Sequence, residues 1–150
     1  MIEQPKKYTN DEGNKIWYLP SKGRDYLHRL DGPAFEDVDG TKEWWVDDKR
    51  HRLDGPAVED ADGTKKWWVE GKRHRLDGPA VEWKSGSKEW LVDGRRHRLD
   101  GPAVEDVDGT KEWWINGKEL PTDEVKNWLE ENNIDLTTEE GQMAFKLRWS

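Results

Sequence analysis

Four copies of a His-Arg-Leu-Asp-Gly-Pro-Ala phrase carry the side chains best suited to binding chemistry. The copies begin at His28, His51, His74 and His97, each 23 residues after the one before. An arginine can hold a carboxylate or a phosphate with two parallel hydrogen bonds, so a row of these clusters could bind a phosphate-bearing ligand or an acidic partner. In the alternative interpretation, each arginine pairs with an acidic residue of the next repeat and each histidine hydrogen-bonds the bent backbone. The candidate binding residues are His28, Arg29, Asp31, His51, Arg52, Asp54, His74, Arg75, Asp77, His97, Arg98 and Asp100.

A second set of candidates is aromatic. Trp67 and Trp68 are adjacent, and adjacent side chains of a strand point to opposite faces. We expect Trp67 to point inward, because it shares its face with Val69. The other face then carries Trp45, Trp68 and Trp114, with Leu91 at the equivalent place in the third repeat. These rings could stack on a ligand or could cover lysine stems and neighbouring strands.

Metal binding and catalysis find little support in the sequence. The segment Asp60-Ala61-Asp62-Gly63 is similar to the start of a calcium loop, but the later ligands are missing, which favours an ordinary hairpin turn. The chain has no cysteine, no histidine pair with zinc spacing and no serine placed with histidine and aspartate as a nucleophile. The sequence therefore predicts no catalytic residue, no metal site and no cofactor. Groups that recur four times suit a binding surface.

A fixed period between 20 and 50 residues indicates a repeat architecture. Within each repeat we expect a strand such as 65–70, closed into a hairpin by Glu70-Gly71. The return strand, 73–82, should bend or bulge at Gly78-Pro79, because proline cannot donate to a strand ladder. The predicted fold class is mainly β, an elongated antiparallel sheet of stacked hairpins.

The predicted domains are a repeat array over 1–118 and a helical cap over 119–150. The repeats lie near 11–27, 28–50, 51–73, 74–96 and 97–118. The first is degraded, with a strand at 16–19 and a longer loop within 20–25, as expected of a terminal repeat.

Two helices are predicted in the cap. The first begins near Pro121, buries Val125, Trp128 and Leu129, and ends at Asn132-Asn133. The second is capped by Thr137 with Glu140 and carries Met143, Ala144 and Leu147 on one face. Both should cover the open edge of the last strand.

Composition narrows the class of protein. Hydrophobic residues make up 32% and charged residues 39%, which alone would favour disorder, but 11 tryptophans can supply a core. The sequence has no apolar run long enough for a membrane span and begins with a polar segment unlike a signal peptide, so we expect a cytoplasmic protein. A net charge of −8 disfavours nucleic acid as a partner. An exposed N-terminal sheet edge could pair two chains into a homodimer.

The segment from Gly40-Thr41-Lys42-Glu43-Trp44-Trp45 through Lys49-Arg50-His51 resembles a MORN repeat or its shorter variant. The fuller phrase His-Arg-x-Asp-Gly-Pro-Ala resembles repeat proteins of tailed bacteriophages and large DNA viruses, over about residues 11–118. The chain departs from the family where Arg52-Leu53 replaces a glycine and where tryptophans replace tyrosines. The resemblance implies an elongated, twisted sheet of hairpins used for protein contacts and sometimes for lipid headgroups.

These observations predict a non-enzymatic binding module with a protein partner. The resemblance adds the hypothesis of a phage protein in the host cytoplasm that engages a host protein, for instance to blunt a defence system. The alternative is a protein that sequesters an anionic small molecule such as a nucleotide, held by the histidine and arginine rows and stacked on tryptophan. An enzyme is the third interpretation.

Overall fold

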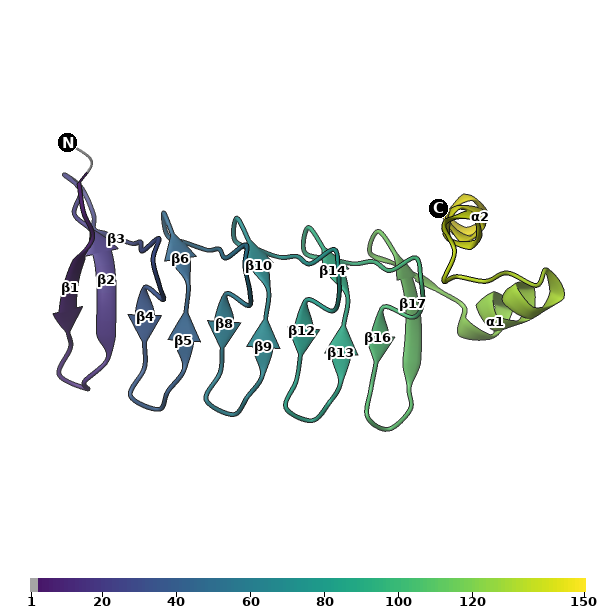
Figure 1. The fold of residues 1–150 in the computed structure, drawn as a ribbon, viewed down its shortest axis with the longest axis horizontal. Coiled ribbons are helices and arrows are strands. Elements are labelled where there is room, and N and C mark those ends of the chain that lie inside the picture. The colour runs from purple at the N-terminus through teal and green to yellow at the C-terminus, as the bar shows by residue number, and fades with distance from the viewer. Residues whose placement is uncertain (1–2) are drawn as a thin grey trace. The chain divides into compact units, whose positions relative to one another are not determined.

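The computed structural model describes residues 3–150, in which short antiparallel strands are followed by two helices (Figure 1). Strand accounts for 30% of the chain and helix for 14%, which confirms the predicted fold class, mainly β with hairpins and a C-terminal helix pair. Contacts group the chain into an N-terminal unit that ends at His74 and a C-terminal unit that begins at Arg75. The division predicted at residue 118 separates repeats from helices and stays a prediction.

The N-terminal unit is built of short antiparallel strands. Its main sheet has the order β1-β2-β4-β5-β8-β9, with β3 paired to β2, while β6–β7 and β10–β11 form separate hairpins. The strands are β1 (Lys6–Thr9), β2 (Lys15–Leu19), β3 (Tyr26–Leu27), β4 (Phe35–Glu36), β5 (Lys42–Glu43), β6 (Trp45–Val46), β7 (Lys49–Arg50), β8 (Val58–Glu59), β9 (Lys65–Lys66), β10 (Trp68–Val69) and β11 (Lys72–Arg73).

The C-terminal unit continues the same pattern and ends in helices. Its main sheet has the order β12-β13-β16-β17-β18, and β14–β15 form a separate hairpin. The elements are β12 (Val81–Glu82), β13 (Lys88–Glu89), β14 (Leu91–Val92), β15 (Arg95–Arg96), β16 (Val104–Glu105), β17 (Lys111–Ile115), β18 (Lys118–Leu120), α1 (Thr122–Glu131) and α2 (Glu139–Trp149).

The prediction of one continuous strand over 65–70 is wrong, because the strand is interrupted at Trp67 and forms β9 and β10. The equivalent residue Trp44 shows the reason. Its N–H donates to the Ala57 carbonyl at 2.8 Å, and its carbonyl accepts from the His51 N–H at 3.1 Å. The backbone therefore changes partners at this tryptophan, from the main sheet to the small hairpin.

The predicted hairpin turns and the predicted bend are confirmed, but the return strand predicted at 73–82 is wrong, because β11 ends at Arg73 and β12 begins only at Val81. Glu70 and Gly71 have φ values of 50° and 77°, as a tight turn with two left-handed residues requires. The chain bends over 76–78, directly before Pro79. The first full repeat has Asp48 at φ 59° in place of the glycine, and the Asp48 carboxylate accepts a hydrogen bond from the Leu27 N–H at 2.7 Å.

The fully buried side chains of the repeats are small. Ala34, Ala57, Ala80 and Ala103 have no exposed surface, and a buried valine follows each of the last three. Trp67, which the sequence predicts to point inward, is only half-buried, as are Trp44 and Trp90. The core of a repeat is therefore a narrow Ala-Val layer, and the indole rings form its margin.

The N-terminal end contains a strand that the sequence did not predict. β1 pairs with β2 in the register Lys6↔Tyr18, and the Tyr8 and Tyr18 rings meet edge to face at 5.8 Å between centroids. Every residue of β1 is exposed, and its sequence, Lys-Lys-Tyr-Thr, has no alternation of apolar and polar residues from which a strand could be predicted. The predicted longer loop is confirmed between β2 and β3.

The first C-terminal helix is confirmed, but the cap of the second is wrong by one residue. The N-cap of α2 is Thr138, whose Oγ1 accepts the Gly141 N–H at 3.0 Å. Thr137 lies one residue earlier, where its hydroxyl and N–H donate to the Asp135 carboxylate at 2.7 and 2.9 Å.

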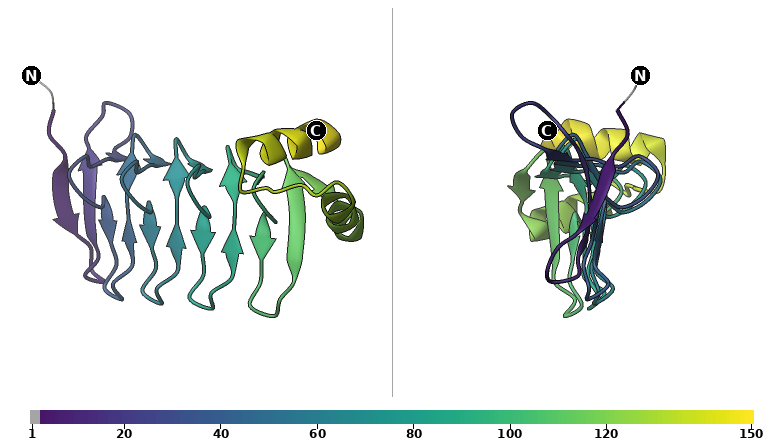
Figure 2. Two further views of the ribbon diagram at one scale, coloured as in Figure 1. Left: turned by 45° about the vertical axis from the view of Figure 1, so that its right-hand side comes forward. Right: turned by 90° about the vertical axis from the view of Figure 1, so that its left-hand side faces the viewer.

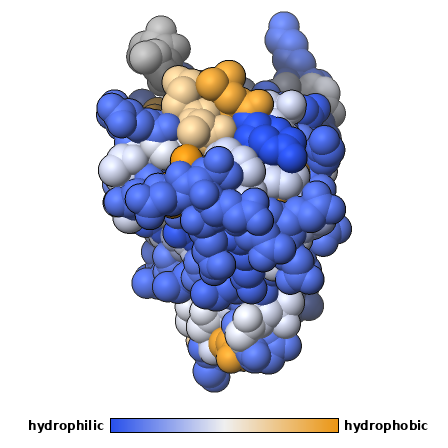
Figure 3. All heavy atoms as spheres, turned by 90° about the vertical axis from the view of Figure 1, so that its right-hand side faces the viewer, coloured by the Kyte–Doolittle hydropathy of each residue, from blue (hydrophilic) through white to orange (hydrophobic). Residues whose placement is uncertain are grey.

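The predicted buried face of α2 is also wrong. Met143 and Leu147 are 56% and 78% exposed, whereas Gly141 and Phe145 are buried. The Phe145 ring lies 5.6 Å from that of Trp113, and both belong to the cluster that joins α1 and α2 to β17 and β18. Figure 2 shows the two helices beside β17. The face at the helical end is otherwise largely hydrophilic, with a small apolar patch (Figure 3). Within residues 3–150, neither helix has the length and apolar character that a membrane crossing needs.

Candidate functional site

Each predicted arginine is bound by acceptors of its own repeat. Arg52 donates from Nε to the Asp54 carboxylate at 2.9 Å. Its Nη1 donates to the Pro56 carbonyl at 3.0 Å and to the Glu59 carboxylate at 3.1 Å. The arginine thereby closes the bent loop between β7 and β8, and Pro56, which cannot donate, contributes its carbonyl instead.

The same guanidinium is stacked on an indole. The Arg52 Cζ lies 3.9 Å from the centroid of a Trp44 ring, within the range of a cation–π interaction worth about 0.5–2 kcal/mol. On the loop side, a Cβ placed on Gly55 would lie 3.0 Å from the Arg52 Cζ. Glycine at this position leaves room for the stacked side chain, which explains the glycine of the repeated His-Arg-Leu-Asp-Gly-Pro-Ala phrase.

The other three loops repeat these contacts. Nε–Asp distances are 2.8 Å for Arg29, 3.0 Å for Arg75 and 2.7 Å for Arg98. Arg75 and Arg98 also bond Glu82 and Glu105 at 3.1 and 2.7 Å, whereas Arg29 lies 3.8 Å from Glu36. Arg29 and Arg98 stack on Trp17 and Trp90 at 4.1 and 3.7 Å.

Each arginine meets one carboxylate within its loop and one on the strand that follows. The Arg52 guanidinium faces Asp54 in the loop and Glu59 in β8, and Glu59 also lies in register with Lys42 and Lys65 of the neighbouring strands. The Asp54 side chain is 85% exposed, so its outer oxygen faces solvent. The hydrogen bond from Arg52, together with its charge, holds the Asp54 pKa below its usual value, and the corresponding arginines do the same for Asp31 and Asp77.

The predicted histidines bind the next hairpin turn. The Nδ1 of His51 accepts the Glu70 N–H at 3.1 Å, and that of His97 accepts the Asn116 N–H at 3.1 Å. His28 has the same relation to Asp47, whose N–H lies at 3.3 Å and whose carboxylate lies at 2.8 Å. His74 occupies the equivalent position. Burial and the charge of Lys146 lower the pKa of His97.

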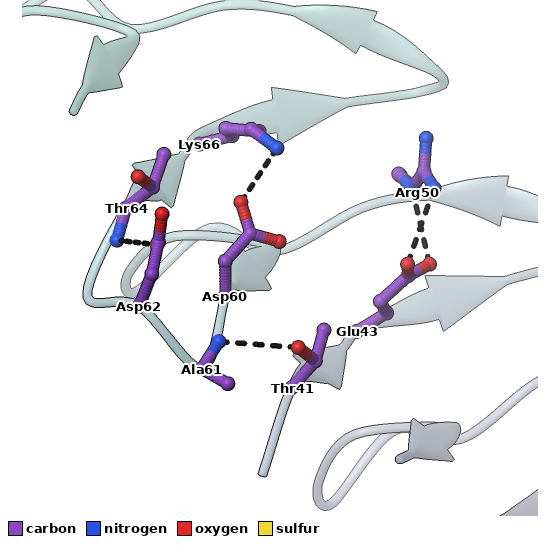
Figure 4. Close-up of polar contacts among 8 residues, drawn as sticks. All are labelled: Thr41, Glu43, Arg50, Asp60, Ala61, Asp62, Thr64 and Lys66. Carbon is purple, nitrogen blue, oxygen red and sulfur yellow. Dashed lines mark hydrogen bonds and ion pairs between the residues drawn. The ribbon is translucent and has the colours of Figure 1, made fainter. Parts of the chain in front are cut away.

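The second-face tryptophans Trp45, Trp68 and Trp114 are partly covered by arginines. The Arg50 guanidinium binds the Glu43 carboxylate twice, at 3.1 and 3.2 Å (Figure 4), and lies between the Trp45 and Trp68 rings at 4.9 and 5.3 Å. The Trp45 Nε1 donates to Glu43 at 2.7 Å. Trp114 repeats the arrangement with Glu112 at 3.0 Å and Arg96 at 5.0 Å. Guanidinium groups therefore lie against these rings, where the sequence predicted lysine stems.

The Asp60–Gly63 segment is a hairpin turn between β8 and β9 (Figure 4). The Asp62 carboxylate accepts the Thr64 N–H at 2.7 Å, and the Asp60 carboxylate binds Lys66 at 2.6 Å. Over residues 3–150, no group of three or more His, Asp or Glu side chains could hold a metal ion.

Comparison with protein-family models finds no match, and a search of curated proteins finds none either.

The leucines of the same loops were not among the residues predicted from the sequence. Leu30, Leu53 and Leu76 are 78–80% exposed, each directly after a bound arginine. A signal was present, because an apolar residue at a fixed step in a polar loop needs either a partner or a packing role. The glutamates that pair with the arginines also showed a signal in the sequence, since each lies seven residues after its arginine.

Proposed function

We propose that this chain is a non-enzymatic repeat module that binds a protein partner through its arginine loops. The observation that carries the proposal is the exposure of Leu30, Leu53 and Leu76, 78–80% each, at the same position of successive repeats. Single exposed leucines are common on protein surfaces, but regular repetition of one on a closed loop is typical of a recognition surface.

The loops are also well suited to present these leucines. In each loop the arginine is bound by an aspartate and a proline carbonyl, so the loop backbone is held in one conformation in the free chain. Binding to a surface that is already ordered loses less conformational entropy. The loops thus offer preorganised apolar contacts.

The resemblance of the repeat phrase to phage and viral proteins extends the proposal. On that resemblance, the setting is the cytoplasm of a host cell, and the partner is a host protein, with defence proteins as the first to test. The nucleotide alternative stays a prediction. No contact favours it, because the guanidinium donors of the arginine loops already bind carboxylates.

Two measurements on the full chain test the proposal. The tagged chain is used to capture proteins from a bacterial lysate, with the tag alone as control, and the captured protein is then purified and titrated calorimetrically. We expect one protein that binds with a defined stoichiometry. In parallel, thermal unfolding and tryptophan fluorescence are followed with added nucleotides, and we expect no saturable change. A nucleotide that shifts both readouts, together with no captured protein, would overturn the proposal in favour of the sequestering alternative.

A further inference from the structure

In two repeats a glutamate binds the arginine that lies seven residues after it. Glu43 accepts from the Arg50 Nε and Nη2 at 3.1 and 3.2 Å, and it also accepts from the Trp45 Nε1 at 2.7 Å. In the C-terminal unit, Glu89 likewise accepts from the Arg96 Nε. The Glu43 carboxylate therefore joins an indole N–H and a guanidinium of its own repeat.

The repeat of residues 51–73 has a lysine in place of this glutamate. Lys66 occupies the position that Glu43 occupies one repeat earlier. The Lys66 Nζ binds the Asp60 carboxylate at 2.6 Å, whereas Glu43 binds Arg50, as Figure 4 shows. This repeat therefore keeps its tryptophan and its arginine but has no glutamate to accept from them.

Two donors of this repeat are left without an acceptor. Over residues 3–150, the Trp68 Nε1 and the Arg73 Nε are buried and make no hydrogen bond. Their equivalents, the Trp45 Nε1 and the Arg50 Nε, both donate to one glutamate. The Arg73 Cζ lies 5.4 Å from the centroid of the Trp68 ring, against 4.9 Å for Arg50 and Trp45, so the two pairs are similarly arranged. An N–H that is buried without an acceptor destabilises the fold, and an added acceptor would remove this cost.

A carboxylate suits this place in charge as well as in geometry. A hydrogen bond from a guanidinium to a carboxylate is charge-assisted and stronger than one between neutral groups. A second cation is present in Lys66, whose side chain is 26% exposed, and its partner Asp60 is 27% exposed. Ion pairs that water reaches contribute little to stability, and the lysine stem is flexible. The Lys66 side chain can therefore turn away from Asp60 and admit a ligand to the two covered nitrogens.

We propose that Lys66, Trp68 and Arg73 form a site for the carboxylate group of a ligand. This carboxylate accepts from the Trp68 Nε1 and the Arg73 Nε, as Glu43 does from its own partners, and the Lys66 ammonium pairs with it. Two sources share this chemistry, an acidic side chain of a partner protein and a small carboxylic acid. No residue of the arginine loops takes part, so the inference goes beyond the proposed function and does not depend on it.

The test follows the indole N–H signals of the isotope-labelled full chain by NMR. Sodium acetate is added at constant ionic strength, with sodium chloride as the reference salt, and Trp68→Phe assigns the Trp68 signal by removing it. We expect acetate to shift the Trp68 signal saturably and to leave the Trp45 signal in place, because the Trp45 N–H already donates to Glu43. No shift with acetate, or an equal shift with chloride, would overturn the inference.

Two short peptides with blocked ends distinguish the sources of the carboxylate. One carries a central glutamate and the other a glutamine. A shift of the Trp68 signal by the glutamate peptide supports an acidic side chain as the ligand, whereas a shift by acetate alone supports a small carboxylic acid. A glutamine peptide that shifts the signal as strongly as the glutamate peptide would show that no carboxylate is needed, against the inference.

A matched pair of variants separates the site from general attraction between charges. Lys66→Glu supplies the carboxylate from the chain itself, so we expect the Trp68 signal to move without any ligand and the acetate response to disappear. Lys72→Glu makes the same change of charge at an exposed residue of β11, and it should keep the acetate response. An acetate response that survives in Lys66→Glu, or that is lost equally in both variants, would overturn the site.

A further variant tests the donor and not the charge. Arg73→Lys keeps the positive charge but removes the Nε donor, and we expect it to weaken acetate binding about tenfold. A Trp45 signal at its parent position shows that the variant is folded. Acetate binding as tight as in the parent chain would exclude Arg73 from the site and contradict the inference.

Discussion

Arg52 joins a turn, a strand and an indole of the same chain. It holds the loop through Asp54 and the Pro56 carbonyl, reaches the strand through Glu59, and stacks on Trp44. Exposed ion pairs contribute only about 0–1 kcal/mol, but this side chain is 21% exposed and combines several contacts at one planar group. The planar guanidinium, and not only its charge, is therefore needed.

We predict that Arg52→Lys lowers the free energy of unfolding by about 1–3 kcal/mol, because lysine keeps the charge but loses the stacking and the directed hydrogen bonds. Urea denaturation measures the change. The control is Arg24→Lys, at a side chain that is 78% exposed and pairs with Asp48, where we expect a change within about 0.5 kcal/mol. Equal effects of the two variants would show that charge alone matters.

The two C-terminal helices complete the apolar cluster of their unit. Trp113, Ile115 and Leu120 come from β17 and β18, and they pack with Val125 of α1 and Phe145 of α2. Gly141 allows α2 to approach the preceding loop, since a Cβ there would lie 1.9 Å from the Asp135 carbonyl oxygen. The helices therefore pack as part of a shared core and are not a loosely attached tail.

For the packing of the two helices, we predict that Phe145→Ala lowers the free energy of unfolding by about 3–5 kcal/mol, through lost burial and the cavity that remains. Leu147→Ala serves as the matched control two residues away, because its side chain is 78% exposed, and it should change stability by less than about 0.5 kcal/mol. Far-UV circular dichroism against urea follows both variants. A larger loss for Leu147→Ala would contradict the buried face of α2 described above.

Carboxylates held by hydrogen bonds are distributed over the whole molecule. Asp31, Asp54 and Asp77 are held by arginines, and Asp108 and Asp135 by threonines, and the pKa of each lies below the ordinary value of 3.8. Because the folded chain binds these protons more weakly than the unfolded chain, their stabilising contribution is complete above pH 3.8 and is lost as the pH falls through the folded pKa values.

We therefore predict that the thermal unfolding midpoint falls steadily between about pH 4 and about pH 2. Circular dichroism melts over this range measure the slope. A triple variant, Asp31→Asn, Asp54→Asn and Asp77→Asn, should show a shallower decline than the parent chain, because three of the titrating groups are removed. A midpoint that stays level or rises on acidification would contradict the charge pattern of the arginine loops.

Several features follow from the sequence because they depend on local chemistry. The 23-residue step, the turn at Glu70-Gly71 and the helix capped by Asn132 are set by spacing, by residues that tolerate left-handed backbone and by helix-end preferences. The repeated phrase likewise marked the arginines as special, but the alternative that it offered, pairing with acidic residues of the next repeat, is wrong in its partner, because each arginine pairs within its own repeat. These signals act within a few residues, so they can be read without the fold.

Only the tertiary structure decided where a strand breaks and which side chains are buried, exposed or covered. The break at Trp67, the burial of Phe145 in place of Leu147, and the covering of Leu99 but not Leu53 depend on segments far apart in sequence. The repeats are nearly identical, so sequence cannot distinguish a covered loop from an open one. Coverage depends on what packs beside each copy, and that is a property of the folded chain.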